Sequence, residues 1–313
     1  MPGLCLHAWR MFDAPNLPPF GGFAFIGEPL DRADAMRVDD AALAAAWDTA
    51  CLLLLDDQGR AAANEDGQPF ALSPADLGGG PGAAVFLGQS EGRAWFSLEA
   101  STVPVSAPRW IDLREAALLW PAQAATAFSH ARGMAYWHAR CRFCGVCGAA
   151  LAFTRGGYLA RCGQCSTEHY PRVDPAVIMA VECEGHLLLG RQKSWAPRRW
   201  SVLAGFVEPG ESLEQTVVRE AWEETRVRVR AVRYMGSQPW PFPGALMLGF
   251  AARAEQDPPE VDGELEDARW FTVAEIGAAI ARDAEDDGEG IRLSPPISIS
   301  RSLIEHWYHR QRG

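Results

Sequence analysis

The chain has 313 residues, with 29 Lys and Arg against 40 Asp and Glu, so its formal net charge is −11. Hydrophobic residues make up 48% and charged residues 22%, which is typical of a globular protein and too apolar for intrinsic disorder. The net negative charge argues against nucleic-acid binding over a broad electrostatic surface, although a local basic patch could still bind nucleic acid.

The sequence shows no sign of a membrane segment or an export signal. Its uninterrupted apolar runs fall well short of the ~20 residues that a membrane helix needs. The segment from Met1 to Asp13 has no basic flank followed by an apolar stretch. We therefore expect a cytoplasmic protein, in which disulfides are improbable and the 8 cysteines need another explanation.

The N-terminal part of the chain alternates short apolar stretches with turn signals. Residues 83–88 and 93–98 are typical of a hairpin. Residues 111–138 are rich in alanine and predict a helix with a start or kink at Pro121. Together these elements predict a β-rich domain over residues 1–138 that ends in a helix.

Two Cys-x-x-Cys pairs follow this domain. Each pair can direct two thiolates from one tight turn toward a single ion, and the intervening residues 151–160 are expected to fold back as a short hairpin. Four thiolates complete a tetrahedral zinc shell with no open position, so the site should be structural. We expect a zinc ribbon over residues 139–169, while the nearby Cys141 should remain a free thiol. The four expected zinc ligands are Cys144, Cys147, Cys162 and Cys165.

From residue 170 onward, strand patterns flank helical ones, which predicts an α/β domain. The expected strands cover residues 177–181, 187–190, 201–207, 227–234 and 245–254. The expected helices cover residues 212–225 and 297–307.

Three glutamates lie on one side of the helix expected over residues 212–225. Glu220, Glu223 and Glu224 stand at positions i, i+3 and i+4. Carboxylates this close repel one another unless divalent cations lie between them, and Mg²⁺ and Mn²⁺ accept such oxygen ligands. A solvated acidic helix face is the alternative. The residues expected to pack this helix against a sheet are Val217, Val218, Ala221 and Trp222.

These residues carry a resemblance to a known family. The motif from Gly205 to Glu224, Gly-x5-Glu-x7-Arg-Glu-Ala-x-Glu-Glu, resembles the Nudix box of hydrolases that cleave a nucleoside diphosphate linked to another group. Residues 237–243, Ser-Gln-Pro-Trp-Pro-Phe-Pro, resemble a motif of the NADH pyrophosphatase branch of that family. This branch also has a four-cysteine ribbon followed by a Tyr-Pro-Arg segment, which here begins at Tyr170.

The resemblance implies a fold and an activity. The fold would be a mixed sheet sandwiched by helices over residues 170–309, an α/β (α+β) Nudix domain behind the ribbon and the β-rich domain. The activity would be metal-dependent hydrolysis of the pyrophosphate of NAD(H) to nicotinamide mononucleotide and AMP, with removal of NAD caps from RNA 5′ ends as a second expected reaction. A broad dinucleotide or ADP-ribose pyrophosphatase, and a non-catalytic RNA- or nucleotide-binding module, are the alternatives.

The resemblance also implies cofactors and an assembly. One structural zinc ion per chain is expected, and roughly two or three catalytic Mg²⁺ or Mn²⁺ ions. The family is commonly a homodimer. The expected ligands of the divalent ions are the backbone carbonyl of Ala204 and the side chains of Glu220, Glu223, Glu224 and Glu264, with Glu223 as a further ligand or base.

The remaining roles implied by the resemblance concern the loop before the helix and the substrate. Glu211 and Arg219 would brace this loop and orient the glutamates behind Gly205. Trp240 and Phe242 would offer flat faces on which a ring of the substrate stacks. The expected substrate contacts are Tyr170, Gln238, Pro239, Trp240, Pro241, Phe242, Pro243, Gly244, Ala245 and Ser300.

Two positions depart from the family pattern. Arg226 stands where the box normally has a glycine, and Ala245 stands where the second motif normally ends in serine. We expect Arg226 to keep the left-handed backbone that glycine adopts without steric penalty after a helix. Neither departure removes a metal ligand, so we expect activity to survive and substrate affinity to change.

Overall fold

The computed structural model describes residues 20–27, 29–77, 80–261, 263–282 and 288–312. The expectation for Met1 to Asp13 lies outside these residues. The chain divides into two compact units. Unit 1 contains the segments 174–238 and 245–313 together with the N-terminal residues up to Phe23, and unit 2 contains Ala24–Val173 and Pro239–Gly244. Of the helices within the described ranges, none combines the length and apolar character that crossing a membrane requires.

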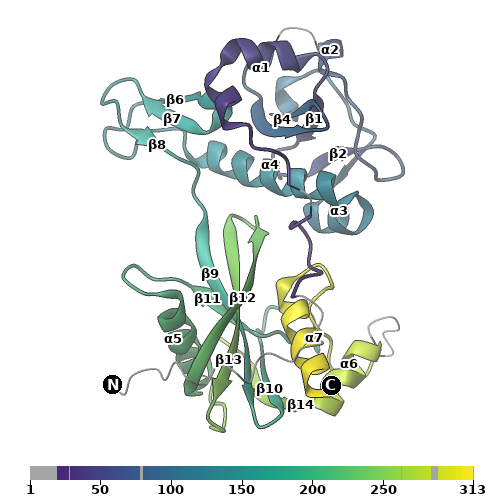
Figure 1. The fold of residues 1–313 in the computed structure, drawn as a ribbon, viewed down its shortest axis with the longest axis vertical. Coiled ribbons are helices and arrows are strands. Elements are labelled where there is room, and N and C mark those ends of the chain that lie inside the picture. Colours follow the sequence, from purple (N-terminus) through teal and green to yellow (C-terminus); the bar gives the residue numbers. More distant parts are fainter. Residues whose placement is uncertain (1–19, 28, 78–79, 262, 283–287, 313) are drawn as a thin grey trace. The chain divides into compact units, whose positions relative to one another are not determined.

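Unit 2 is built around a five-stranded sheet with the order β3-β4-β1-β2-β5 (Figure 1). Strands β1 and β4 are parallel, and the other pairs are antiparallel. The strands are β1 (Cys51–Leu55), β2 (Ala61–Ala63), β3 (Val85–Ser90), β4 (Arg93–Glu99) and β5 (Arg109–Ile111). The helices are α1 (Asp40–Trp47), α2 (Pro74–Leu77), α3 (Leu113–Leu119) and α4 (Ala122–Arg140), with the 3-10 turns η2 (Asp34–Val38) and η3 (Ala100–Thr102).

Both faces of this sheet are buried because successive side chains of a strand point to opposite sides. In β1, Leu53 packs in the same cluster as Phe128 of α4. Its neighbour Leu54 packs with Trp47 of α1 on the other face. The leucine run that begins at Leu52 therefore forms a central strand. Helix α4 packs on one face of the sheet, and α1 packs on the other.

The expected hairpin over residues 83–98 and the expected break at Pro121 are both confirmed. Strands β3 and β4 form the hairpin. Helix α3 ends at Leu119 and α4 begins at Ala122, with Pro121 as the residue before its first turn. Proline is well tolerated at a helix start but removes a hydrogen bond inside a helix, so the alanine-rich segment forms two helices.

A small three-stranded antiparallel sheet follows α4, and we call it the ribbon sheet. It contains β6 (Leu151–Thr154), β7 (Leu159–Cys162) and β8 (Glu168–His169), and the 3-10 turn η4 (Arg155–Gly157) joins β6 to β7. The expected fold-back over residues 151–160 is confirmed.

Unit 1 contains a mixed six-stranded sheet with the order β12-β13-β9-β10-β14, and β11 also pairs with β9. Strand β13 is parallel to β9, whereas β10 and β11 are antiparallel to it. The strands are β9 (Asp174–Cys183), β10 (His186–Arg191), β11 (Leu203–Phe206), β12 (Val229–Trp240), β13 (Ala245–Ala254) and β14 (Asp267–Thr272). The helices are α5 (Leu213–Thr225), α6 (Val273–Arg282) and α7 (Ile299–Arg312).

The helices of unit 1 cover opposite faces of this sheet (Figure 1). Met179 of β9 packs with Ala221 of α5. The next residue, Ala180, points to the other side and packs in the cluster that contains Trp307 of α7 and Ile276 of α6. A mixed sheet between two helical layers is the fold expected for this part of the chain.

Candidate active site and zinc site

Helix α5 begins at a well-defined turn. The backbone N–H of Glu211 donates to the carbonyl of Glu208 at 3.1 Å, and Gly210 between them has φ +95°, which glycine adopts without strain. Ser212 and Gln215 then form a capping box, in which each side chain accepts from the other's backbone N–H at 3.2 and 2.8 Å. The turn and the cap fix where the helix starts, and so fix which way its glutamates point.

Arg219 joins the turn to the glutamates of α5. Its Nε and Nη2 donate to the two carboxylate oxygens of Glu211 at 2.6 and 3.0 Å. Its Nη1 donates to Glu220 at 2.9 Å and to Glu223 at 2.8 Å, and Nη2 also reaches the carbonyl of Phe206 at 2.9 Å. The planar guanidinium therefore holds the loop and two of the glutamates in one network.

The carboxylates in this network have perturbed pKa values. The hydrogen bonds from Arg219 lower the pKa of Glu211 to about 2, so this side chain stays charged. Burial raises the pKa of Glu220 despite the opposing effect of Arg219, and the charges of Glu223 and Glu264 add to the rise. Glu264 thus lies within electrostatic reach of Glu220, although it follows far along the sequence. A cation among these groups would relieve the repulsion.

Gly205 lies directly beneath Glu220. A β-carbon built at Gly205 would come within 1.9 Å of both Cδ and Oε1 of Glu220. Such an approach is impossible for real atoms, so the carboxylate occupies space that only glycine leaves open. Strand β11 holds Gly205 in place by pairing with β9, and the carbonyl of the half-buried Ala204 belongs to the same strand.

The three glutamates in the second half of α5 differ in exposure. The side chain of Glu220 is 13% exposed and that of Glu223 is 52% exposed, whereas Glu224 is buried. The expectation that Trp222 packs on the sheet is wrong, because 45% of this residue is exposed. Val217 and Ala221 fill the sheet-facing positions instead, and Trp222 falls beyond the edge of that apolar stripe.

The oxygen atoms at this site would suit a hard divalent cation, because carboxylate and carbonyl oxygens are what Mg²⁺ and Mn²⁺ prefer. The carboxylate oxygens of the glutamates are nevertheless not gathered as closely as the cysteine sulfurs are. In the described part of the chain, the four ribbon cysteines are the one group of three or more His, Cys, Asp or Glu residues whose ligand atoms all lie within 4.8 Å of one another.

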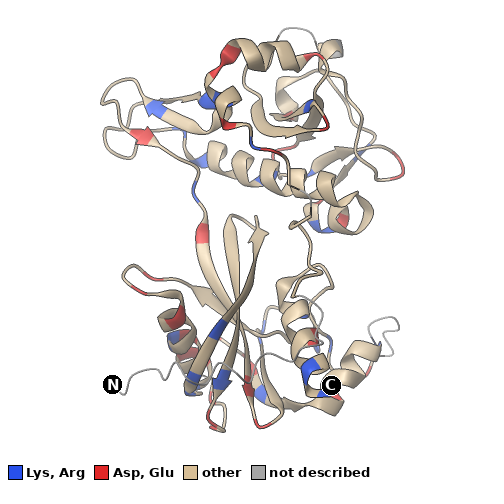
Figure 2. Cartoon of the chain, in the orientation of Figure 1, with Lys and Arg blue, Asp and Glu red and all other residues tan. Residues whose placement is uncertain are grey.

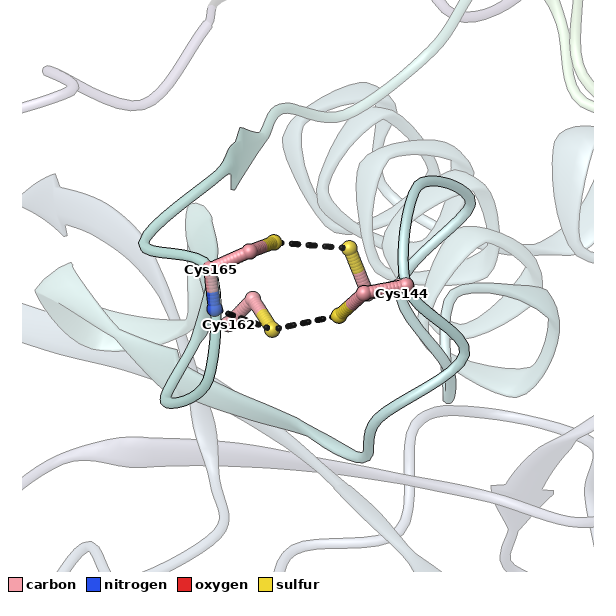
Figure 3. Close-up of side chains that lie close together, drawn as sticks. Cys144, Cys162 and Cys165 are labelled. Carbon is pink, nitrogen blue, oxygen red and sulfur yellow. Dashed lines mark hydrogen bonds between the residues drawn. The ribbon is translucent and has the colours of Figure 1, made fainter.

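The four cysteines of the ribbon converge on one point (Figure 3). The Sγ atoms of Cys144 and Cys165 are 3.6 Å apart, and those of Cys147 and Cys162 are 3.4 Å apart. A tetrahedral zinc ion with bonds of ~2.3 Å requires sulfur separations of ~3.8 Å. Cys141 lies outside this group. The site can therefore hold zinc in a closed shell.

The backbone around Cys144 favours a thiolate. The backbone N–H of Cys147 is the largest cause of a low pKa at Cys144, which falls to about 5, and the backbone N–H of Val146 contributes as well. Such N–H groups at a tight turn stabilise the charged sulfur that a metal binds.

Gln238 and Ser300 are buried inside unit 1. The side-chain amide of Gln238 donates to the carbonyl of Ile297 and accepts from the N–H of Ile299, both at 2.8 Å. It thereby ties β12 to the first residue of α7. The hydroxyl of Ser300 lies 2.8 Å from that of Ser201 and donates to Ser294 at 3.1 Å.

The segment Pro239–Gly244 belongs to unit 2, where its side chains contact α3 and α4. The ring of Trp240 lies 4.9 Å from that of Phe242, between ring centroids. The guanidinium of Arg114 stacks on Phe242 with its Cζ 3.8 Å from the ring centroid, and Arg132 donates to the carbonyl of Pro241 at 2.9 Å. No sequence pattern pointed to Arg114 or Arg132, because their partners lie more than a hundred residues away along the chain.

Tyr170 lies at the surface of unit 2. It is 58% exposed, and its hydroxyl donates to Glu168 at 2.6 Å. This hydrogen bond is the main cause of a raised pKa at Tyr170.

Arg226 has φ +58° at the end of α5, so the expected left-handed backbone is confirmed. Its N–H donates to the carbonyl of Trp222 at 2.8 Å, which closes the last turn. The following arginines are neutralised locally. Arg228 pairs with Asp257 at 2.5 Å, and Arg230 pairs with Glu255 at 2.5 Å.

Comparison with known proteins finds relatives along most of the chain. A model of the NUDIX domain matches residues 171–293, and a model of an NADH pyrophosphatase-like rudimentary NUDIX domain matches residues 39–137. The NAD-capped RNA hydrolase NudC of Mycobacterium bovis is 38% identical over 288 residues, or 88% of this chain and 92% of that protein. NudC of Chromobacterium violaceum is 40% identical over 226 residues, 71% of this chain and 79% of the relative. Human NAD-capped RNA hydrolase NUDT12 is 41% identical over 191 residues, which cover 57% of this chain and 40% of the human protein.

Proposed function

Because the chain belongs to the NADH pyrophosphatase branch of the Nudix hydrolase family, we propose that it hydrolyses the pyrophosphate of NAD(H) to nicotinamide mononucleotide and AMP. We propose further that it removes NAD caps from RNA 5′ ends, the reaction for which its relatives are named. The observation that carries the proposal is the position of Glu220. Its carboxylate packs against Gly205 and accepts a hydrogen bond from Arg219.

The glutamates of α5, together with Glu264 and the carbonyl of Ala204, are the proposed ligands of about two or three Mg²⁺ or Mn²⁺ ions. When bound, such ions neutralise a pyrophosphate and lower the pKa of a water for attack on phosphorus. The acidic chain would otherwise repel an anionic substrate. Glu223 is more exposed than Glu220 and Glu224, and we assign it the role of a further ligand or base.

Arg219 and Glu211 are the proposed positioning residues. Glu211 accepts two hydrogen bonds from Arg219 as well as those from the Glu208 N–H and the Thr216 hydroxyl, at 3.1 and 3.0 Å. This arrangement fixes the guanidinium, which in turn fixes Glu220 and Glu223. When cations bind, these two carboxylates would exchange hydrogen bonds from Nη1 for metal ligation while the Glu211 pair keeps the loop in place.

For the substrate, we propose contacts with Tyr170 and with the segment from Pro239 to Ala245. Tyr170 is exposed, and the rings of Trp240 and Phe242 are partly buried rather than enclosed. Gln238 and Ser300 are bonded inside unit 1, so we propose that they support the site without touching substrate. We also propose one zinc ion in the ribbon per chain and a homodimeric assembly.

The proposed function is tested by comparing three substrates: NADH, NAD-capped RNA and ADP-ribose. Each is incubated with Mg²⁺ or Mn²⁺, and the products are separated by chromatography. Values of kcat/KM that are higher for NADH and NAD-capped RNA than for ADP-ribose support the proposal. A preference for ADP-ribose would favour the broad pyrophosphatase, and the absence of turnover on all three would favour a binding module.

A further inference from the structure

The ribbon is a basic region in an acidic chain. Residues 139–173 contain five arginines and one glutamate, a formal charge of +4, whereas the whole chain carries −11. A zinc ion with four thiolates would bring a formal charge of −2, so the region stays positive with its metal bound. Figure 2 shows Lys and Arg recurring over the strands and loops around β6 and β7. This sign reversal is local, and it lies in the module next to the substrate contact expected at Tyr170.

The strand register places Arg161 on an exposed face of the ribbon sheet together with Glu168. Arg161 on β7 lies directly opposite Ala152 on β6 and Glu168 on β8, so all three point to the same side. Tyr170 is two residues beyond Glu168 and bonds to its carboxylate, which places the ring on this side as well. The charge of Arg155 is close enough to act on the Tyr170 hydroxyl.

The arginines of this face are available for a ligand. Within the described residues, neither Arg155 nor Arg161 forms a hydrogen bond or ion pair through its guanidinium, and both are exposed. The exposed arginines at the start of β12 behave differently, because Arg228, just before the strand, and Arg230, within it, each pair with a carboxylate. The guanidinium groups of Arg155 and Arg161 therefore have no carboxylate partner among the described residues, whereas those of Arg228 and Arg230 do.

We propose that the outer face of the ribbon sheet, where Arg155, Arg161 and Tyr170 lie together with the single carboxylate of Glu168, binds the single-stranded RNA that follows an NAD cap. The guanidinium groups would contact phosphates and the tyrosine ring would stack on a base, which is how proteins bind single strands without reading their sequence. An acidic protein surface would pair with the two arginines but would leave the ring of Tyr170 without a stacking partner. RNA offers both phosphates and bases, so it is the favoured partner. This inference rests on the proposed decapping function for its biological substrate.

The test compares two double variants that remove the same charge. Arg155→Gln with Arg161→Gln changes the ribbon face, and Arg228→Gln with Arg230→Gln is the matched control. Binding is measured by the fluorescence anisotropy of a short single-stranded RNA without a cap, over a range of salt concentrations. Removal of two phosphate contacts should reduce the slope of log affinity against log salt by ~1.4, and so weaken binding by about 25-fold at ~0.1 M salt. The control should bind as the wild type does.

Cleavage assays complete the test. The ribbon variant should cleave free NADH at the wild-type rate but show a higher KM for NAD-capped RNA at low salt. Unchanged RNA affinity in the ribbon variant, or an equal loss in the control, would overturn the proposal and leave a protein partner as the alternative. If the wild type cleaves neither substrate, the proposed function fails, while the anisotropy measurement still decides whether this face binds RNA. If the double variant does not fold, Arg161→Gln alone, on an exposed strand position, gives the same comparison.

Discussion

The carboxylate of Glu220 lies against the α-carbon of Gly205, so close that a β-carbon at Gly205 would approach its Cδ and Oε1 to 1.9 Å. This relationship explains why a motif with glutamates on a helix begins with a glycine on a strand. The helix provides the carboxylate, and the strand provides the space beneath it.

Gly205→Ala should therefore fold but lose activity. The alanine methyl would push away the flexible end of Glu220, and a displacement of ~1 Å in an active site costs roughly 10²-fold in turnover. Steady-state kinetics and a melting curve measure the two effects. Gly21→Ala is the control, because a β-carbon there has nothing within 4 Å. Wild-type turnover in Gly205→Ala would show that catalysis does not depend on the position of the Glu220 carboxylate against Gly205.

Glu224→Gln should abolish most of the turnover at an unchanged fold. The substitution preserves size and helix propensity but removes a charge from the proposed ligand set, and we expect a decrease of at least ~10²-fold in kcat at saturating metal. Glu214→Gln changes an exposed glutamate in the first turn of the same helix and should have no effect. If both variants are equally active, Glu224 has no part in the mechanism.

Cys144→Ser should release zinc and destabilise unit 2, because binding of a structural metal is coupled to local folding. Elemental analysis of the purified wild type should give one zinc ion per chain that magnesium does not replace. Cys141→Ser, outside the four-cysteine group, should keep its zinc and its melting temperature. A zinc-free wild type with the same melting temperature as the loaded protein would exclude a structural role for the metal.

The pair of Glu211 and Arg219 should make stability depend on acid pH. Arg219 lowers the pKa of Glu211 from 4.5 to about 2, so its contribution to folding is fully present above pH 4.5 and is lost as the pH falls toward 2. Glu211→Gln should be less stable than the wild type at neutral pH, and the difference should shrink between these two values. Urea unfolding across this pH range measures it, with Glu208→Gln as the control. A difference independent of pH would exclude the ion pair as its cause.

Arg226→Gly should stabilise the protein by up to ~1 kcal/mol, because a left-handed backbone strains any residue with a β-carbon. Turnover should be unchanged. Arg226→Ala keeps the β-carbon but loses the guanidinium, so the comparison of the two variants separates backbone strain from side-chain contacts. A glycine variant less stable than the alanine variant would contradict this explanation.

Local patterns in the sequence predicted the parts of this structure that depend on local physics. The helix expected over residues 212–225 is α5, which begins at Leu213 directly after its cap Ser212. Pro121 marked the division between α3 and α4. The left-handed backbone of Arg226 followed from the geometry that a chain needs to leave a helix.

Other features depended on tertiary packing and had no local signal. The motif implies that Gln238 contacts substrate, but this residue is fully buried and its amide bonds to the start of α7. Trp222 reads as a core residue but lies beyond the stripe that packs on the sheet. The paired bonds of Arg219 to Glu220 and Glu223 depend on how the loop returns to the helix, which spacing along the helix does not determine.

The central claim is that the glutamates around Glu220 support hydrolysis of a pyrophosphate bond. The most direct measurement is the identification of products from NADH by chromatography, with wild-type protein and Glu220→Gln, with Mg²⁺ or Mn²⁺ and with a chelator. We predict reduced nicotinamide mononucleotide and AMP from the wild type with metal, and at least ~10²-fold less product from the variant or the chelated enzyme. Equal product formation by Glu220→Gln, or release of nicotinamide in place of the mononucleotide, would contradict the claim.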